Sequence, residues 1–360
     1  MRRIVVKLGS ALLIDADGEV RREWLVTLIA DVAALRRKGI EVIIVSSGAI
    51  ALGSRRLGLA DGGRGSLDDA QASAAAGQIL LSGLYAELLA AEGLTAAQML
   101  VTLDDLADRR RYLNAGATLD RLLALGAIPV INENDSTATE EIRFGDNDRL
   151  SARVGQAAGA DLVVLLSNVA GIYDRDPGLG GARLIADIQP DARIDAVLGP
   201  SSGAGSGGMA AKVDAGRIAA ASGITLAIAD GRGTNPLARY LDGGAATVFR
   251  PASTPAARKS WLLGHLDPRG TLRIDDGAST ALAEGRSLLA AGVTGVSGGF
   301  RRGDAVEVHD ADGKLLARGL VGYDADETRI IAGQRTDAQA GLLGYAPRAA
   351  VIHRNDMVLI

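Results

Sequence analysis

The sequence of 360 residues contains no cysteine and only three histidines, His265, His309 and His353. The absence of cysteine excludes disulfide bonds, thiolate nucleophiles and cysteine-bound metal, and it is compatible with a reducing cytosol. The first 264 residues contain neither histidine nor cysteine. Chemistry in that region must therefore use Lys, Asp, Glu or Ser, or need no general base.

Long apolar runs are also missing. The basic N-terminus has only three apolar residues in a row before Lys7, which is too short for the core of a signal peptide. We find no run near the roughly 18 uncharged apolar residues of a membrane span. The net charge of −4 does not favour nucleic acid or an anionic membrane as the main partner. The sequence therefore predicts a cytoplasmic protein with no membrane partner.

Short apolar runs alternate with helical patterns along most of the chain. Nearly continuous apolar runs are typical of strands that are buried on both faces of a parallel sheet. These runs are "IVVKLG" (4–9), "EVIIVSSG" (41–48), "IPVINEN" (128–134) and "DLVVLLSN" (161–168). Residues 23–39 show helical spacing of leucine and isoleucine, and Gly39 is expected to end that helix. The pattern predicts an α/β fold, an open and mainly parallel sheet sandwiched between helices.

The pattern changes near residue 250, where two prolines and little periodicity predict a linker. Short runs with turn signals follow, among them "GTLRIDDGA" and "TRIIAG", and they predict a small β-rich domain. We expect the α/β domain over residues 1–255, the linker over 256–267, the β-rich domain over 268–350 and a C-terminal tail over 351–360. Residues 268–350 hold 10 Lys and Arg against 11 Asp and Glu, so no basic surface for RNA is indicated.

Glycine-rich turns follow the predicted strands at "KLGS" and "SSGAI", and a third, "GPSSGAGSGGMAAK" (199–212), precedes a helix that begins near Met209. In an open α/β sheet ligands bind at the carboxyl ends of the strands, where glycine lets backbone N–H groups approach an anion. Such turns can also be simple connectors. The stretch does not fit the P-loop pattern, and no GxGxxG pattern is followed by a strand-linked acidic residue, so a nucleotide would be held in another way.

An acidic stretch, "NENDSTATEE" (132–141) followed by "GDNDRLSA" (145–152), raises the question of what balances its charge. Phosphoryl transfer to a carboxylate needs no general base, because the nucleophile is already an anion, but it needs cations and tight positioning. Lys7 at the end of the first strand and Lys212 at the start of a helix are the candidates. The alternatives are solvated surface lysines and, for "GDND", a capped helix start.

Several motifs in order over almost the whole chain resemble the amino acid kinase family. They include "VVKLGSALL", "VSSGAIALG", "RRRYLNAGATL", "PVINENDSTATEEIRFGDNDRLSA" and "SGGMAAK". The C-terminal segment resembles a PUA domain. The resemblance implies ATP-dependent phosphorylation of the L-glutamate side-chain carboxylate to γ-glutamyl phosphate, the first step of proline synthesis. It also implies Mg²⁺ bound with ATP rather than in a protein cage, L-proline as an inhibitor, a homo-oligomer and channelling to the next enzyme.

The resemblance also implies roles for individual residues. The lysines would grip the transferring phosphoryl group, and an aspartate would hold both lysines. The catalytic set would be Lys7, Lys212 and Asp148. The glutamate-binding set would be Ser47, Asn132, Asp135, Asp146 and Asn147, with Asp135 pairing with the α-ammonium. The ATP-binding set would be Lys7, Ser167, Asn168, Ser206, Gly207, Gly208, Met209, Ala210, Ala211 and Lys212. The family often has Thr-Asp where this chain has Ser167 and Asn168.

Other functions remain open on the sequence. Another amino acid kinase would accept aspartate, N-acetylglutamate, carbamate or a nucleotide monophosphate instead of glutamate. An RNA-binding regulator would act through the PUA-like domain, although its charge balance does not favour RNA. The segment from Glu133 to Gly145 is expected to close over glutamate or proline.

Overall fold

A computed structural model describes most of the chain, with Asp146 described for its backbone only. The described residues are 1–15, 17–137, 146–176, 178, 180–190, 208–251, 267–348 and 350–360. The chain forms two compact units, one made of residues 1–107 and 115–252 and the other of residues 108–114 and 253–360. The predicted domain and linker boundaries stay predictions.

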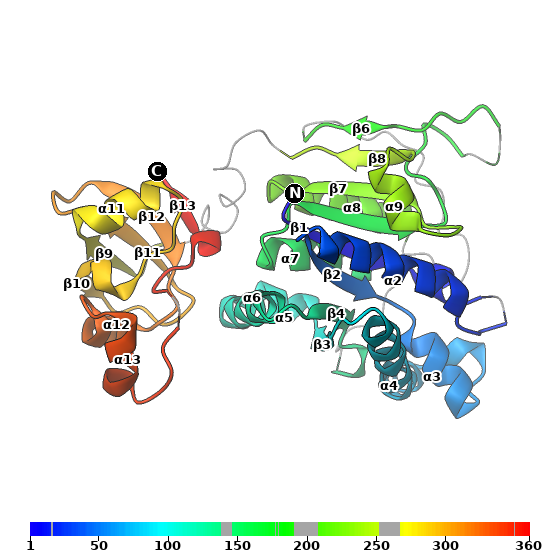
Figure 1. The fold of residues 1–360 in the computed structure, drawn as a ribbon, viewed down its shortest axis with the longest axis horizontal. Helices are drawn as coiled ribbons and strands as arrows, with labels where there is room; N and C mark the ends of the chain where they lie inside the picture. Colours follow the sequence, from blue (N-terminus) through cyan, green and yellow to red (C-terminus); the bar gives the residue numbers. More distant parts are fainter. Residues whose placement is uncertain are drawn as a thin grey trace. The chain divides into compact units, whose positions relative to one another are not determined.

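A sheet of eight strands forms the centre of the first unit (Figure 1). Its order is β3-β4-β2-β1-β5-β7-β8-β6, in which the first six strands run parallel, β8 is antiparallel to β7, and β6 is parallel to β8. The strands are β1 (Arg3–Leu8), β2 (Glu41–Ser46), β3 (Ala96–Val101), β4 (Ile128–Glu133), β5 (Leu162–Ser167), β6 (Asp187–Ile188), β7 (Thr225–Asp230) and β8 (Ala246–Phe249).

Helices cover both faces of this sheet. The helices between residues 10 and 241 are α1 (Ser10–Leu13), α2 (Arg22–Arg37), α3 (Ala49–Leu57), α4 (Leu67–Ala91), α5 (Leu103–Ala107), α6 (Arg109–Ala124, of which residues 109–114 belong to the second unit), α7 (Asp146–Ala157), α8 (Met209–Ala221) and α9 (Pro236–Leu241), with short 3₁₀ turns η1 (Asp61–Gly63) and η2 (Asp135–Thr137). Figure 1 shows α2 and α9 on one face, and α7 and α8 on the other. The predicted fold class is confirmed.

The central strands are buried along their whole length, as their continuous apolar runs predict. Ile4, Val6 and Leu8 of β1 pack into one core with residues of α2. Because successive side chains point to opposite faces of a strand, Lys7 lies on the other face, which α7 covers. The four predicted strands are all present as β1, β2, β4 and β5, and α2 occupies the predicted helix, with Gly39 at a φ of 77° just beyond its end.

Helix α4 corrects the prediction that no apolar segment of the chain approaches the length of a membrane span. It has 25 residues and is long and apolar enough, by length and composition, to cross a membrane. Its glycines show that it packs against protein: a Cβ on Gly77 would lie 1.8 Å from the carbonyl oxygen of Ala49 in α3, and one on Gly53 of α3 would lie 1.7 Å from that of Ser73. Because α3 and α4 touch backbone to backbone and Leu81 belongs to the buried core, one face of α4 packs against the rest of the first unit.

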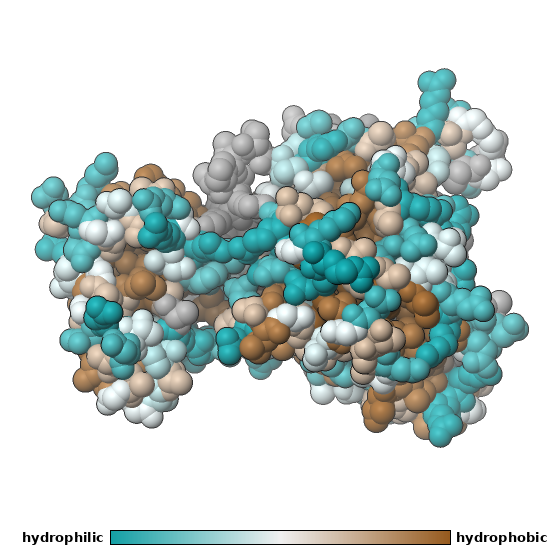
Figure 2. All heavy atoms as spheres, in the orientation of Figure 1, coloured by the Kyte–Doolittle hydropathy of each residue, from teal (hydrophilic) through white to brown (hydrophobic). Residues whose placement is uncertain are grey.

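The opposite side of α4 is exposed. Ile79 is 76% and Leu80 is 43% exposed, and Figure 2 shows apolar side chains on the surface over α3 and α4. The exposed side explains why only 33% of the apolar 18-residue stretch of α4 is buried.

The second unit contains a sheet of five strands in the order β10-β9-β11-β12-β13. The strands are β9 (Gly270–Ile274), β10 (Val293–Gly298), β11 (Ala305–His309), β12 (Leu315–Leu320) and β13 (Met357–Leu359), and the helices are α11 (Asp276–Ala283), α12 (Ala325–Ile331) and α13 (Thr336–Leu343), with 3₁₀ turns η4 (Ala290–Gly292) and η5 (Arg354–Asp356). Strand β13 places part of the predicted tail in this sheet.

One element of this unit differs from the prediction. The run "TRIIAG" was expected among the β-rich segments, but residues 325–331 form α12. Asp324 and Glu327 form a reciprocal capping box, in which each side chain accepts a hydrogen bond from the backbone N–H of the other residue. Since this cap satisfies N–H groups at the helix start, the local capping signal outweighs the β-branched composition of the run.

Candidate active site

The candidate site lies where the parallel strands of the first unit end. Lys7 is the residue before the last one of β1, Ser47 directly follows β2, Asn132 is near the end of β4, and Ser167 ends β5. Since β2, β1 and β5 are adjacent and parallel, their carboxyl ends meet at one edge of the sheet. Ligands bind at this edge in open α/β sheets.

A buried carboxylate between two lysines forms the centre of the site. Lys7 Nζ lies 2.5 Å from Asp148 Oδ1, and Lys212 Nζ lies 2.9 Å from Asp148 Oδ2. Asp148 is in the first turn of α7 and Lys212 in the first turn of α8, so three elements that are distant in sequence meet here. The side chains of Lys7 and Lys212 are 7% and 11% exposed, and that of Asp148 is 0% exposed.

The charges of these three groups depend on one another. Burial lowers the pKa of Lys7, the carboxylate of Asp148 raises it, and the ammonium group of Lys212 lowers it again, so that the pKa of Lys7 lies below its ordinary value. Burial raises the pKa of Asp148, but the two lysines outweigh this effect and hold the pKa below its usual range. Asp148 is therefore a carboxylate at neutral pH, and it is the group that keeps two ammonium ions together.

Glycine gives access to the lysine on β1. A Cβ on Gly9, directly after β1, would lie 3.9 Å from Lys7 Nζ, so the backbone there comes close to the ammonium group. Gly48, directly after β2, has a φ of 114°, which is a left-handed conformation that disfavours side chains. The conformation of Gly48 explains the glycine of "SSGAI", whereas a Cβ at Gly9 of "KLGS" would make only an ordinary contact.

A hydrogen-bonded group of polar side chains lies beside this charged centre. Asn147 Nδ2 donates to Ser47 Oγ at 2.9 Å and to Asn132 Oδ1 at 3.1 Å. Asn147 precedes Asp148 in α7, which joins this polar group to the lysines. The structure thus brings together Ser47, Asn132 and Asn147, three of the residues in the predicted glutamate-binding set.

The remaining members of that set are placed differently. Asp135 is half-buried in η2, and its carboxylate raises the pKa of Arg64, while burial lowers that pKa overall. The side chain of Asp146 lies outside the described residues, although its backbone begins α7. Most of the predicted closing segment, residues 138–145, is outside the described part of the chain. The prediction that one residue of "GDND" caps α7 stays a prediction, because the position before this helix is also outside the described part.

The predicted ATP-binding residues lie at the same edge where they are described. Ser167 is buried at the end of β5, Asn168 is exposed next to it, and Gly208 precedes α8. Residues 209–212 form the first turn of α8, so only Lys212 of these is seen in the charged centre. Ser206 and Gly207 lie outside the described residues. The roles of all these residues stay predictions.

Sequence reasoning missed several residues that support the polar group. Gln78 of α4 accepts a hydrogen bond at 2.9 Å from Asn132 Nδ2, and Tyr85 of α4 donates at 2.8 Å to Ser46 Oγ next to Ser47. Burial raises the pKa of Tyr85 above its ordinary value, so its hydroxyl stays a donor. No motif marks these positions, because they lie about two turns apart in an ordinary helix.

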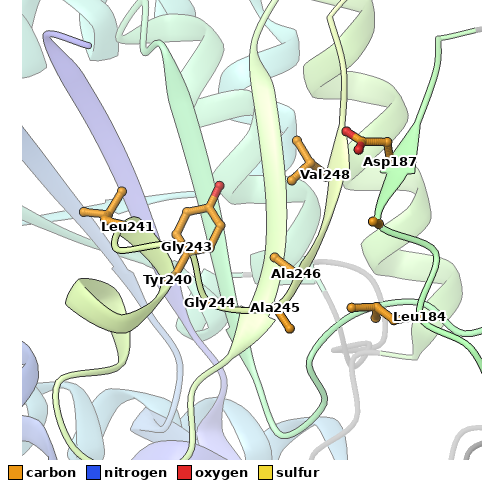
Figure 3. A pocket seen from close by; sticks show the side chains of 10 residues that line it. Leu184, Asp187, Tyr240, Leu241, Gly243, Gly244, Ala245, Ala246 and Val248 are labelled. Carbon is orange, nitrogen blue, oxygen red and sulfur yellow. The ribbon is translucent and has the colours of Figure 1, made fainter.

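A separate hollow of about 490 Å³ lies at the other end of the sheet (Figure 3). Tyr240 of α9 and Val248 of β8 line one side of it, and Leu184 and Asp187 line the other. Asp187 is paired with Arg250 at 2.6 Å. This hollow contains none of the predicted site residues.

Comparison with known proteins gives the class of this protein. Residues 2–230 match the model of the amino acid kinase family, and residues 270–339 match that of the PUA domain. The chain therefore belongs to the amino acid kinase family and carries a PUA domain. It is a kinase, and membership of the family implies ATP as the co-substrate.

Individual relatives are similar over nearly the whole chain. The chain is 58% identical to the glutamate 5-kinase of Novosphingobium aromaticivorans, over 99% of this chain and 96% of that protein. It is 59% identical to the glutamate 5-kinase of Sphingopyxis alaskensis, over 99% and 97%, and 53% identical to that of Zymomonas mobilis, over 99% and 91%.

Proposed function

We propose that this kinase transfers the γ-phosphoryl group of ATP to the side-chain carboxylate of L-glutamate, giving γ-glutamyl phosphate in the first step of proline biosynthesis. Identities of 53% to 59% with three glutamate 5-kinases support glutamate as the acceptor. The observation that carries the proposal is the pair of buried lysines held by Asp148 at the carboxyl edge of the sheet.

The proposed reaction brings together two anions. A side-chain carboxylate oxygen attacks the γ-phosphorus, a P–O bond forms, and the bond between that phosphorus and the bridging oxygen breaks, so that ADP leaves with the electron pair. No proton is removed, which agrees with the absence of histidine and cysteine from the first 264 residues. Lys7 and Lys212 balance the negative charge that accumulates on the transferring and leaving oxygens.

Asp148 acts as a positioning residue in this mechanism. Two ammonium groups held close together repel each other, and Asp148 contacts both of them. Its carboxylate raises the pKa of Lys7 against the effect of burial, and its contacts with both lysines fix where they point before the substrates arrive. Such preorganised charge is worth more in a site from which water is excluded.

The proposed glutamate site uses Ser47, Asn132 and Asn147, with Asp135 for the α-ammonium group and Asp146 beside them. The proposed nucleotide site uses Ser167, Asn168 and residues 206–212, where the N-terminus of α8 adds positive potential. Mg²⁺ is proposed to arrive with ATP. Among the described residues no three His, Asp or Glu side chains form a metal-binding group, so phosphate oxygens and water would supply most of its ligands.

We also propose that L-proline inhibits the enzyme by competing with glutamate. Proline has the α-carboxylate and a protonated α-nitrogen but lacks the distal carboxylate, so groups such as Asp135 would hold it without phosphoryl transfer. Inhibition of this kind raises the apparent KM for glutamate and leaves kcat at saturation unchanged. Initial rates over a glutamate series, with and without proline, test this proposal.

The remaining proposals concern assembly and place in the cell. A cytoplasmic homo-oligomer, with channelling of the unstable acyl phosphate to the next enzyme, follows from the resemblance. The nearly balanced charge of residues 268–350 does not favour RNA as a partner of the PUA domain. Light scattering of the purified chain and filter binding of RNA at several salt concentrations test these two points.

The acceptor is tested by measuring ADP release with L-glutamate, L-aspartate, N-acetyl-L-glutamate and carbamate. We expect kcat/KM for glutamate to exceed the others by at least about tenfold, since the wrong acceptor leaves buried polar groups unpaired. An equal or higher value for another acceptor would contradict glutamate as the substrate.

A further inference from the structure

A continuous chain of side-chain hydrogen bonds leads from the surface of α4 into the polar group. Ser82 donates to Gln98, and Gln78 Nε2 donates to Ser82 Oγ at 3.3 Å. Gln78 Oε1 accepts from Asn132 Nδ2 at 2.9 Å. Asn132 Oδ1 in turn accepts from Asn147 Nδ2 at 3.1 Å. Gln78 is therefore the link between helix α4 and the two asparagines.

The direction of this chain is fixed by one backbone group. The N–H of Glu133 donates to Asn132 Oδ1 at 2.9 Å, and a backbone N–H can only donate. That end of the Asn132 amide is therefore the oxygen. It follows that the Asn147 atom 3.1 Å away must be the amide nitrogen, and that the nitrogen of Asn132 must face an acceptor, which Gln78 supplies.

This arrangement leaves Asn147 with one free group. Both hydrogens of its amide nitrogen are used, one by Ser47 Oγ and one by Asn132 Oδ1. Its oxygen, Oδ1, is buried and has no hydrogen-bond partner among the residues that the structure describes. A buried acceptor without a partner is unfavourable, so this oxygen is suited to a donor that a ligand brings.

We propose that Gln78 is a positioning residue, which holds the amides of Asn132 and Asn147 in the orientation that presents Asn147 Oδ1 to the α-ammonium group of glutamate. This inference rests on the proposed function. The α-ammonium group is the only hydrogen-bond donor of glutamate at neutral pH, because both of its carboxylates only accept. A reversed Asn147 amide would present N–H groups to that cation instead.

The surroundings of Gln78 limit the size of the expected effect. Gln78 also lines a hollow of about 270 Å³ with Gln98 and Glu133, so water can enter and replace part of a lost acceptor. A hydrogen bond to a charged group is worth more than a neutral one. If the Asn147 amide loses its orientation, and water replaces part of the lost contact, the binding of glutamate is expected to become about tenfold weaker.

The test compares Gln78→Met, which keeps the length of the side chain and removes both polar atoms, with the unchanged enzyme. We expect the KM for glutamate to rise about tenfold, and kcat and the KM for ATP to change less than about twofold. Glutarate has both carboxylates and no ammonium group, so its inhibition constant against glutamate is expected to stay within about twofold. Gln98→Met is the matched control, because it removes an amide from the same hollow and leaves the acceptor of Asn132 in place.

Two further measurements separate positioning from general damage. In an Asn147→Ala background, Gln78→Met should add less than about twofold to the KM for glutamate, because the group through which it acts is gone. Gln78→Glu keeps an acceptor for Asn132 and should stay closer to the unchanged enzyme than Gln78→Met does, and it serves alone if the methionine variant does not fold.

The inference would be overturned if Gln78→Met weakened the binding of glutarate as much as that of glutamate. It would also be overturned if Gln78→Met still raised the KM for glutamate about tenfold in the Asn147→Ala background. An equal rise of the KM for glutamate in Gln78→Glu and in Gln78→Met would also overturn it. These outcomes all require an unchanged enzyme that phosphorylates glutamate. Failure of the proposed function shows instead as a wild-type enzyme that does not turn over glutamate.

Discussion

Replacing Asp148 by Asn is the most informative single change, because it removes one charge and almost no volume. The carboxylate is completely buried and lies 2.5 Å and 2.9 Å from two ammonium groups. Removing one partner of a buried ion pair costs about 3–5 kcal/mol. Since about 1 kcal/mol shifts the melting temperature of a domain of this size by roughly 2–4 °C, we expect Asp148→Asn to melt about 6–20 °C lower.

The same change has a defined pH dependence. Without Asp148, burial and repulsion from Lys212 lower the pKa of Lys7 further below the ordinary 10.5 of lysine. The unfolded variant then binds more protons than the folded variant between the lowered pKa and about 10.5, so its stability rises with pH in that window. We therefore expect the difference in melting temperature between Asp148→Asn and the unchanged protein to become smaller as the pH is raised from 7 to 10.

Asp214→Asn is the matched control for this experiment. Asp214 of α8 pairs with Arg149 of α7 at 2.8 Å, and their side chains are 42% and 38% exposed. An exposed pair of this kind contributes about 0–1 kcal/mol, although it joins the same two helices. We expect Asp148→Asn to lose kcat by roughly 10² or more and Asp214→Asn to keep it. Melting temperatures and kcat of Asp148→Asn that both equal those of Asp214→Asn would refute the reasoning.

Four further predictions concern catalysis, packing and domain independence. Lys212→Ala should lower kcat by roughly 10² or more in a folded protein, because a charge contact in the transition state is lost. Asp135→Ala should raise the KM for glutamate and the inhibition constant for proline together, since both bring a cationic α-nitrogen. Gly77→Ala should destabilise the first unit by about 1–3 kcal/mol or more, because the new Cβ meets the backbone of α3. A chain that ends near residue 262 should keep measurable kinase activity, because all the predicted site residues precede it.

Each of these predictions has a control or a contrary result. Gly83→Ala in the same helix has nothing within 4 Å of its new Cβ and should be neutral or stabilising by up to about 1 kcal/mol. Near-normal kcat in a folded Lys212→Ala protein would mean that this lysine does not contact the transferring group. If Asp135→Ala weakened the binding of only glutamate or only proline, the prediction for Asp135 would be contradicted. A folded truncated chain without activity would contradict the prediction for the truncation.

The parallel sheet could be predicted because its signal is local. Runs such as 4–9 and 161–168 are apolar at every position, and burial on both faces of a sheet is the reason. Strand β3 was not predicted, because it lies at the edge of the sheet and its sequence "AAQMLV" is half-exposed and has Val101 as its one β-branched residue. Helix α12 was misread, because a capping box set the conformation of a run that contains two isoleucines.

The site was predictable only in part, for a different physical reason. Lys7 and Lys212 were suggested by their place at glycine-rich turns, but their common partner Asp148 followed only from the resemblance. Which groups meet is decided by strand order, and here β1 lies between β2 and β5. Gln78 gave no signal at all, because a glutamine on a helix is ordinary until its partner Asn132 is known.

The central claim, phosphoryl transfer to the side-chain carboxylate of glutamate, is tested most directly by trapping the product. The enzyme is incubated with ATP, Mg²⁺, L-glutamate and hydroxylamine, which converts an acyl phosphate into a stable hydroxamate, and the product is identified by mass spectrometry. We predict γ-glutamyl hydroxamate in an amount equal to the ADP released, and none without ATP. An α-hydroxamate, or ADP release with glutamate that yields no hydroxamate, would contradict the account.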